Sequence, residues 1–291
     1  MVRVSWRSFA AASLAGLLTA ATPSVLSANG HGPLFGGATP TLGKGGWQLD
    51  QAWMGRIGRE PNDDEQMLRT MIGFGITEDL QISGSLPISI DSTAFMPRGR
   101  MMAMMSSSQD IEALVGWRFQ RRDMGPGARL ESTLYVSATA PLEDYRADGM
   151  KATPSVYVSA ASGYASRVHY IWLSGGYQRY SEREGDRVGD SVTYSAVYGF
   201  RPSFLQVDYP KPDLRFFVEA VGEHSERGQH HGFEMVTSGG QSLLVGPTAL
   251  LLYKAYGIEG GVLFPVYQRT NGQPEEKLRF AVNFTYFFWR K

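Results

Sequence analysis

The residues whose chemistry stands out first are methionines. The stretch FMPRGRMMAMMSSSQD, residues 95–110, holds a cluster of them: Met96, Met101, Met102, Met104 and Met105. Thioether sulfur is a soft, neutral ligand suited to Cu(I), and the stretch offers no cluster of carboxylates for a harder ion such as Ca²⁺. It is a candidate Cu(I) site in a loop. The alternative is an apolar plug, because methionines form adaptable contact surfaces and the neighbouring Arg98 and Arg100 repel a cation.

Histidines are the next candidates, and their positions do not suggest an enzyme. His169 lies in a predicted strand, whereas His31 lies near the N-terminus and the remaining three lie in or beside a polar loop: His224, His230 and His231. A hydrolase needs a nucleophile with a base in hydrogen-bond reach. The sequence has no nucleophile elbow and no metalloprotease helix motif. We therefore predict no catalytic residues, and no cofactor apart from the candidate copper ion.

Residues 1–27 have the pattern of a secretory signal peptide. Arg3 and Arg7 precede an apolar run over residues 9–21, and small residues follow it. The run is shorter than the ~20 residues of a membrane-spanning helix. Residues 28–46 are then expected to form a Gly-rich periplasmic lead. The localisation implied by export is the bacterial cell envelope.

Composition narrows the class of protein further. The formal net charge is +0, with 28 basic and 28 acidic side chains, so the chain lacks the basic field that binds nucleic acid. It has 0 cysteines, so an exported fold must be stabilised without disulfides. No second apolar run is long enough for a spanning helix, which excludes an all-α membrane protein.

Beyond residue 46 the side chains alternate between apolar and polar. Near the C-terminus, Leu278, Phe280 and Val282 share one face, while Arg279 and Asn283 share the other. About twelve such segments are each close to the length of a tilted transmembrane strand. We expect strands at residues 47–58, 67–76, 80–90, 110–120, 129–140, 154–162, 167–180, 191–200, 214–223, 242–253, 256–268 and 278–288.

The connections between these segments support a membrane barrel over residues 47–291. Longer polar connections alternate with tight turns, apart from RRDMGPGA and RPSFLQVDYPKPD, and this alternation is typical of outer-membrane barrels. We predict an all-β protein, a closed antiparallel transmembrane β-barrel of about twelve strands surrounded by outer-membrane lipid. A soluble β-sandwich is the alternative, because one wet face also produces alternation.

Several motifs carry a family resemblance. The segments WQLDQAW, GFGITEDLQISGSLPISI, GIEGGVLFPVYQ and LRFAVNFTYFFWRK resemble bacterial outer-membrane barrels of the MetA-pathway-of-phenol-degradation family of transporters. The resemblance spans most of the chain after the signal peptide and implies an outer-membrane channel or transporter. It implies a small solute, with aromatic compounds among the candidates, and it supplies no catalytic residues.

If the apolar faces contact lipid, the opposite faces line the lumen. We expect charged side chains there: Asp50, Arg56, Arg69, Glu112, Arg118, Arg129, Glu131, Arg215, Glu219, Glu259 and Arg279. So many buried charges require water or pairing. Their mixed sign argues against a strongly ion-selective pore. The predicted function is passive passage of a small solute, and the alternative is a closed barrel that anchors its surface loops and binds a soft metal through the methionines.

Overall fold

The alternating segments form long antiparallel strands in the computed structural model. The structure describes residues 32–60, 63–89, 110–146, 149–206 and 211–289. The long strands are β1 (Gly46–Gly58), β2 (Glu65–Gly75), β3 (Leu80–Ser89), β4 (Ile111–Gly125), β5 (Ala128–Ala140), β6 (Ser155–Ala165), β7 (His169–Tyr180), β8 (Ser191–Phe200), β9 (Asp213–Ser225), β12 (Gly240–Tyr253), β13 (Tyr256–Arg269) and β14 (Glu276–Trp289). The connections contain β10 (Gln229–His230), β11 (Phe233–Glu234) and a 3-10 helix, η1 (Ser203–Leu205). Within these described ranges, no helix is long and apolar enough to cross a membrane.

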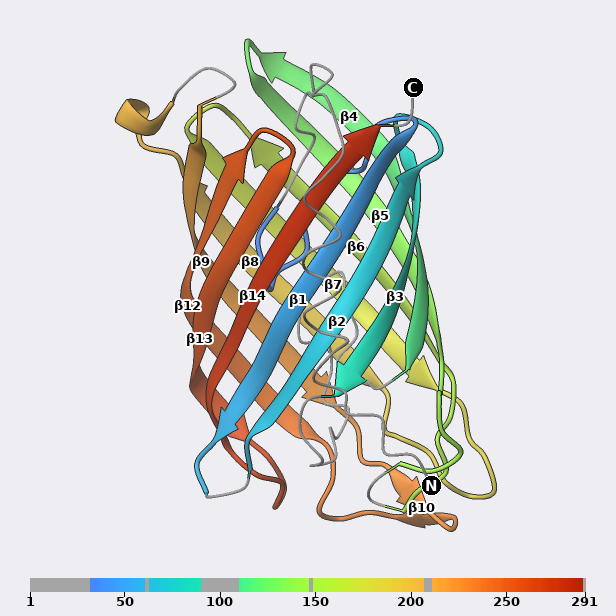
Figure 1. Ribbon diagram of the computed structural model, residues 1–291. Coiled ribbons are helices and arrows are strands. Elements are labelled where there is room, and N and C mark those ends of the chain that lie inside the picture. The colour runs from blue at the N-terminus through green and yellow to red at the C-terminus, as the bar shows by residue number, and fades with distance from the viewer. Residues whose placement is uncertain (1–31, 61–62, 90–109, 147–148, 207–210, 290–291) are drawn as a thin grey trace, which may run out of the picture.

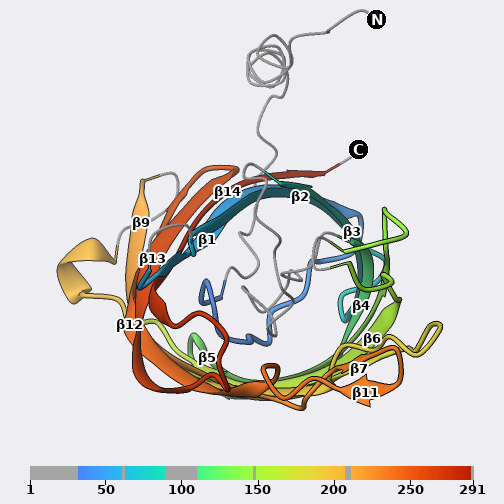
Figure 2. The same ribbon diagram turned by 90° about the horizontal axis from the view of Figure 1, so that it is seen from below.

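The long strands close into one barrel because β1 pairs with β14 (Figures 1 and 2). Each strand is antiparallel to both neighbours, and β9 pairs with β12 because β10 and β11 form a separate small hairpin between them. Closure leaves no sheet edge with unpaired backbone groups. The predicted all-β, closed antiparallel barrel of 12 strands is confirmed.

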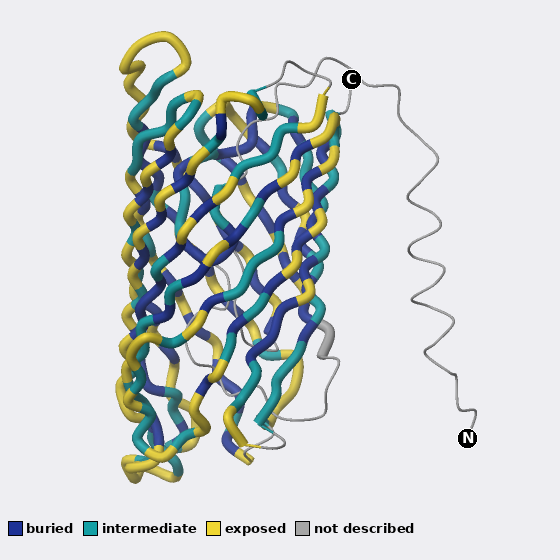
Figure 3. The backbone as a smooth tube through the Cα atoms, turned by 90° about the vertical axis from the view of Figure 1, so that its left-hand side faces the viewer, coloured by how far each residue is buried: buried dark blue, intermediate teal, exposed yellow. Residues whose placement is uncertain are grey.

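Exposed and buried residues alternate along the barrel wall (Figure 3). In β4, for example, Ile111, Val115 and Trp117 are exposed, whereas Glu112 and Arg118 are buried. The outer face is therefore apolar and the inner face polar, the reverse of a water-soluble barrel. This distribution is typical of a barrel that spans a lipid bilayer.

The two ends of the barrel differ in their connections. At one end, called here the long-loop end, the connections include residues 141–154, 181–190 and 226–239. At the other, the short-turn end, strands are joined by turns such as 76–79 and 254–255. The strand β1 begins and β14 ends at the short-turn end, as an even number of strands requires (Figure 1).

Aromatic side chains gather on the outer face at the short-turn end. The rings of Trp47 and Phe288 stack with centroids 5.9 Å apart. Tyr286 lies 5.5 Å from Phe288 and 5.2 Å from Tyr256, again between ring centroids. Rings at the rim of an apolar band match the aromatic girdle of membrane barrels at the lipid–water boundary.

The β4–β5 hairpin is longer than the sequence predicts. We expected a loop from residue 121, but β4 continues to Gly125 and β5 begins at Ala128. All residues from 119 to 125 are exposed, because the hairpin extends past the rest of the barrel (Figure 1). Both of its faces meet water, so the apolar alternation that marks a lipid-facing strand is absent there.

Candidate functional site: the barrel interior

The barrel interior is occupied by part of the chain itself. Residues 32–45, called here the inner segment, run inside the ring of strands before β1 begins (Figure 2). Leu34 and Phe35 are each only 3% exposed. We predicted a periplasmic lead for residues 28–46, and sequence reasoning did not anticipate that this stretch enters the lumen. The only signal for it is a pair of apolar residues between glycines, outside any strand.

Glu219 of β9 binds the start of the inner segment. One carboxylate oxygen accepts a hydrogen bond from the Leu34 N–H at 2.8 Å, and the other accepts from Phe35 at 2.9 Å and Gly36 at 2.7 Å. The hydroxyl of Thr248 donates a further bond at 2.6 Å. A carboxylate that accepts several N–H bonds is a strong anchor, since hydrogen bonds to charged acceptors are stronger than hydrogen bonds to neutral ones.

A second set of contacts holds the middle of the inner segment. The carbonyl of Thr39 accepts a bond from the Thr133 hydroxyl at 2.5 Å, and the Ala38 carbonyl accepts one from the Tyr135 hydroxyl at 2.9 Å. The Trp172 indole donates to the Thr39 hydroxyl at 3.2 Å. These bonds come from β5 and β7, so the segment is tied to strands other than the β9 strand of Glu219.

The contacts of the inner segment depend on small residues. A Cβ built on Gly36 lies 2.5 Å from the Val197 side chain, and one built on Gly37 lies 2.5 Å from the Ser174 hydroxyl. A Cβ on Gly75 would lie 2.1 Å from the Gly43 carbonyl oxygen. Side chains at these positions would push the segment off the wall, which explains glycine on both surfaces.

Apolar packing adds to the hydrogen bonds. Leu34 and Phe35 belong to a buried cluster with apolar wall residues of several strands: Ala52, Met54, Met67, Met71, Val221, Leu244, Leu263 and Ala281. Burying a Leu or Phe side chain contributes about 1.5–3 kcal/mol. The two residues thus pack against an apolar zone of the inner wall.

Arginine–carboxylate pairs line the wall from β2 to β5. Arg118 lies 3.0 Å from Glu131, and Arg129 contacts the same carboxylate at 3.0 Å. Arg69 lies 3.7 Å from Glu112 and donates to the Ser85 hydroxyl at 2.9 Å. Such pairing allows charges to stay buried, because a lone buried charge is destabilising.

The adjoining part of the wall, formed by β1, β14 and β13, carries buried acidic residues. Asp50 of β1 and Glu259 of β13 flank Asn283 of β14, whose amide donates to them at 3.4 Å and 3.5 Å. Thr285 also donates its hydroxyl to Asp50. The carboxylates here are bound by amide and hydroxyl donors, whereas those on β4 and β5 contact arginines.

A third pairing region lies at the long-loop end. Arg279 of β14 binds Glu276 at 2.8 Å, and Arg56 of β1 lies 3.9 Å from the same carboxylate. Glu65 of β2 lies 3.6 Å from Arg56. The three strands are neighbours or next neighbours across the β14–β1 closure, so this network spans the seam of the barrel.

The structure places the predicted lumen residues on the inward face. Nine have buried side chains: Asp50, Arg56, Arg69, Glu112, Arg118, Glu131, Glu219, Glu259 and Arg279. Arg129 and Arg215 are half-buried. Arg215 is bound to Asp213 at 2.7 Å, close to the short-turn end. Their role in conduction stays a prediction.

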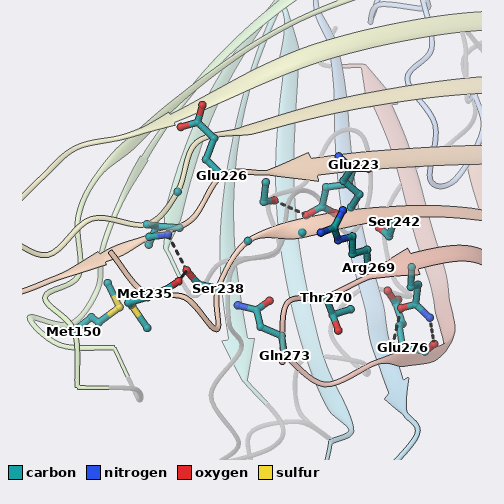
Figure 4. A pocket seen from close by; sticks show the side chains of 18 of the residues that line it. Met150, Glu223, Glu226, Met235, Ser238, Ser242, Arg269, Thr270, Gln273 and Glu276 are labelled. Atoms are coloured by element: carbon teal, nitrogen blue, oxygen red, sulfur yellow. Dashed lines mark hydrogen bonds between the residues drawn. The ribbon is translucent and has the colours of Figure 1, made fainter. Parts of the chain in front are cut away.

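One cavity lies between the wall and the long connections, and another lies between the inner segment and the wall. The larger, of about 80 Å³, opens at the long-loop end and is lined by Glu223, Glu276 and Arg269 among others (Figure 4). The smaller, of about 30 Å³, lies deeper, between Phe35 of the inner segment and Tyr157 of β6. Glu223 lines both. Each holds only a few waters, far below the ~300 Å³ of a small-molecule site.

The remaining candidates lie elsewhere. The methionines of residues 96–105 and His31 fall outside the described residues. His169 is exposed on β7 and its Nδ1 lies 2.9 Å from the Tyr198 hydroxyl. His230 and His231 lie together at the long-loop end, where Asp186 joins them. Sequence reasoning did not connect Asp186 with these histidines.

No protein-family model matches the sequence, and no curated protein matches it. Solved structures match the fold. The crystal structure of the COG4313 outer membrane channel from Pseudomonas putida F1 superposes with a TM-score of 0.59 and 13% identity, over 85% of this chain and 97% of that one. The NanC porin superposes with a TM-score of 0.47 and 8% identity, over 84% of this chain and 100% of that one. OprD from Pseudomonas aeruginosa superposes with a TM-score of 0.40 and 10% identity, over 84% of this chain and 93% of that one. The chain thus shares the barrel fold of the COG4313 channel.

Proposed function

We propose that this chain is an outer-membrane channel for passive passage of a small solute. One observation carries the proposal: the charged interior of the closed barrel is filled by the inner segment, which belongs to no strand of the wall, rather than by wall side chains alone. The inner segment adds no strand to the barrel. It is held by hydrogen bonds, three of them to the carboxylate of Glu219, and by the packing of Leu34 and Phe35. The fold it shares with the COG4313 outer membrane channel supports the same function.

The inner segment is the gate in this proposal. Its removal exposes a wall that carries the charged residues Arg118, Glu131 and Glu219 beside apolar patches. A barrel of about twelve strands is wide enough for at most a narrow pore, between the filled eight-stranded and the open sixteen-stranded barrels. Passage therefore depends on displacement of residues 32–45 from the wall.

The charge arrangement favours a small solute of no single charge sign. Paired arginines line β2 to β5, while Asp50 and Glu259 lie on the β1 and β13 side. A strongly ion-selective pore uses rings of one charge. The resemblance of the sequence to the MetA-pathway-of-phenol-degradation family adds aromatic or weakly polar compounds as candidates. Export by a signal peptide at residues 1–27 delivers the chain to the outer membrane.

Planar-bilayer recording and liposome swelling test the proposal. We expect small, gated conductance from the intact chain and larger, steadier conductance from a variant that lacks residues 32–42. Both proteins are first shown to be folded by the shift in gel mobility between unheated and boiled samples. If folded samples of both pass neither ions nor sugars, the barrel is a closed anchor and the channel function is wrong.

A further inference from the structure

Three side chains with metal-ligating atoms meet at the long-loop end. Asp186 belongs to the connection 181–190, and His230 and His231 belong to the hairpin inside the connection 226–239. One ligand atom from each lies within 4.8 Å of the other two. In the part of the chain that the structure describes, no other group of three His, Cys, Asp or Glu residues meets this criterion.

The spacing of these atoms fits a small transition-metal ion. Bonds of about 2.0–2.1 Å in a tetrahedral zinc site place neighbouring ligand atoms about 3.3 Å apart. The Nδ1 of His230 lies 2.9 Å from Asp186 Oδ1, and the Nδ1 of His231 lies 3.9 Å from the same oxygen. The two distances bracket the required one, so shifts of under an ångström suffice.

Asp186 is already oriented for this role. Its carboxylate accepts the His231 N–H at 2.8 Å and the Lys151 N–H at 2.8 Å, one on each oxygen. Its side chain is 2% exposed. Outer hydrogen bonds of this kind fix ligating carboxylates. Because a carboxylate oxygen has two lone pairs, acceptor capacity remains for an ion.

Turn geometry places the two imidazoles side by side. Successive residues on a strand point to opposite faces, but His231 adopts a left-handed backbone with φ of 51° and Gly232 follows at 82°. The ring centroids of His230 and His231 are consequently 4.0 Å apart. Their side chains are 38% and 75% exposed, so water can occupy the remaining coordination positions.

The cations near the cluster are paired with acidic groups. Arg183 lies 3.3 Å from Asp144 and 4.0 Å from Glu184. The ammonium of Lys151 lies 2.7 Å from the Tyr145 hydroxyl and 3.3 Å from the Glu184 carboxylate. With Glu184 and Asp186 both acidic, the neighbourhood of Lys151 does not carry a net positive charge that would repel an ion.

We propose that Asp186, His230 and His231 bind a borderline divalent transition-metal ion of the Zn²⁺ class. Two imidazoles and a carboxylate suit such ions, whereas Mg²⁺ and Ca²⁺ prefer all-oxygen sites. The ion joins two connections that also line the larger cavity, through Gly189 and Gly228. Its occupancy therefore stiffens one side of the channel mouth, and the site stands whether or not the barrel conducts.

The test is a Zn²⁺ titration of the folded full chain in detergent. Binding is measured by calorimetry or by competition with a chromogenic chelator. We expect one Zn²⁺ per chain, with affinity reduced roughly tenfold or more in His230→Gln and in His231→Gln. His231→Gln keeps the backbone N–H that holds Asp186, so a loss of Zn²⁺ affinity in this variant measures the contribution of the imidazole. His169→Gln is the matched control, because that histidine is also exposed and lies at the short-turn end.

Three results would overturn the site. The first is no Zn²⁺ binding by the parent at concentrations up to roughly 100 μM. The second is unchanged affinity in both histidine variants. The third is an equal loss in His169→Gln, which would indicate scattered surface binding. Cleavage of the connection 226–239 by a protease, with and without Zn²⁺, gives an independent readout: bound metal should slow it in the parent and leave the His231→Gln variant unaffected.

Discussion

Replacing Glu219 by glutamine should loosen the inner segment and open the barrel more often. The substitution keeps the size of the side chain but leaves one acceptor oxygen in place of two. If that oxygen stays with Phe35 and Gly36, the amide NH₂ group faces the Leu34 N–H, and donor meets donor. The bond from Leu34 is lost, the Thr248 hydroxyl on the same side must turn to accept from the amide, and the bonds from Phe35 and Gly36 no longer have a charged acceptor.

The size of the effect follows from these contacts. The lost bond to a carboxylate contributes about 1.5–3 kcal/mol, and the two retained bonds fall to about half their strength. A neutral amide is easier to bury than a carboxylate, which recovers part of the loss. The net weakening of the docked segment is then about 2–4 kcal/mol, a shift of roughly 30-fold to 700-fold toward the displaced state.

Single-channel recording measures this shift as the fraction of time spent in the open state. Glu112→Gln is the control, because Glu112 is equally buried but lies on β4 in an ion pair with Arg69. We expect a large rise in open time for Glu219→Gln and little for the control. If the two variants and the parent open equally often, Glu219 does not hold the gate and the reasoning is refuted.

Three further predictions concern the wall, the loops and the methionines. Arg118→Met should leave the buried carboxylate of Glu131 with Arg129 as its remaining arginine partner and destabilise the barrel by about 1.5–3 kcal/mol. The effect should appear as a lower temperature for the heat-induced gel shift, and an unchanged temperature contradicts it. Burial raises the pKa of Asp190, but hydrogen bonds from Tyr177, Arg187 and a backbone N–H outweigh it, so its pKa lies below the ordinary 3.8. The lowered pKa of Asp190 stabilises the loop at pH values above 3.8, and this stabilisation is lost as the pH falls through the pKa of the folded state. Pepsin should therefore cleave the connection 181–190 faster only at the acidic end of a pH series. Cleavage that already rises at pH 5 contradicts this prediction. An anaerobic Cu(I) competition assay should detect a methionine site that disappears when four residues are replaced by leucine: Met101, Met102, Met104 and Met105. Unchanged Cu(I) binding in that variant, or no binding in the parent, favours the apolar plug.

The strands could be predicted because the environment imposes a period of two on them. In β4 and β14, one face must contact lipid and the other the lumen, so apolar and polar residues alternate. The inward positions of Glu131 and Glu219 follow from the same alternation. The prediction fails where that constraint ends, as in the β4–β5 hairpin beyond the barrel, where both faces meet water.

The inner segment could not be predicted in the same way. Glu219 binds it through backbone N–H groups, and those are common to any sequence. Its residues show no periodicity, because it pairs with no strand. The proposed metal site could also be found only from the folded structure, since Asp186 is 44 residues from His230 along the chain. The sequence identified the His230–His231 pair only as part of a loop.

A reversible lock between the inner segment and the wall tests the central claim most directly. The chain has 0 cysteines, so Gly36→Cys with Ser195→Cys introduces one defined pair. A Cβ on Gly36 lies 3.3 Å from that of Ser195, close to the ~3.5–4.5 Å of a disulfide. We predict that oxidation closes the channel of the double variant in a planar bilayer and that reductant restores its conductance. The conductance of either single cysteine variant should not change between oxidant and reductant, although Gly36→Cys alone should conduct more than the parent because its Cβ crowds the Val197 side chain. Equal conductance of the double variant in its oxidised and reduced forms, with the disulfide verified by mass spectrometry, would contradict a lumen gated by residues 32–45.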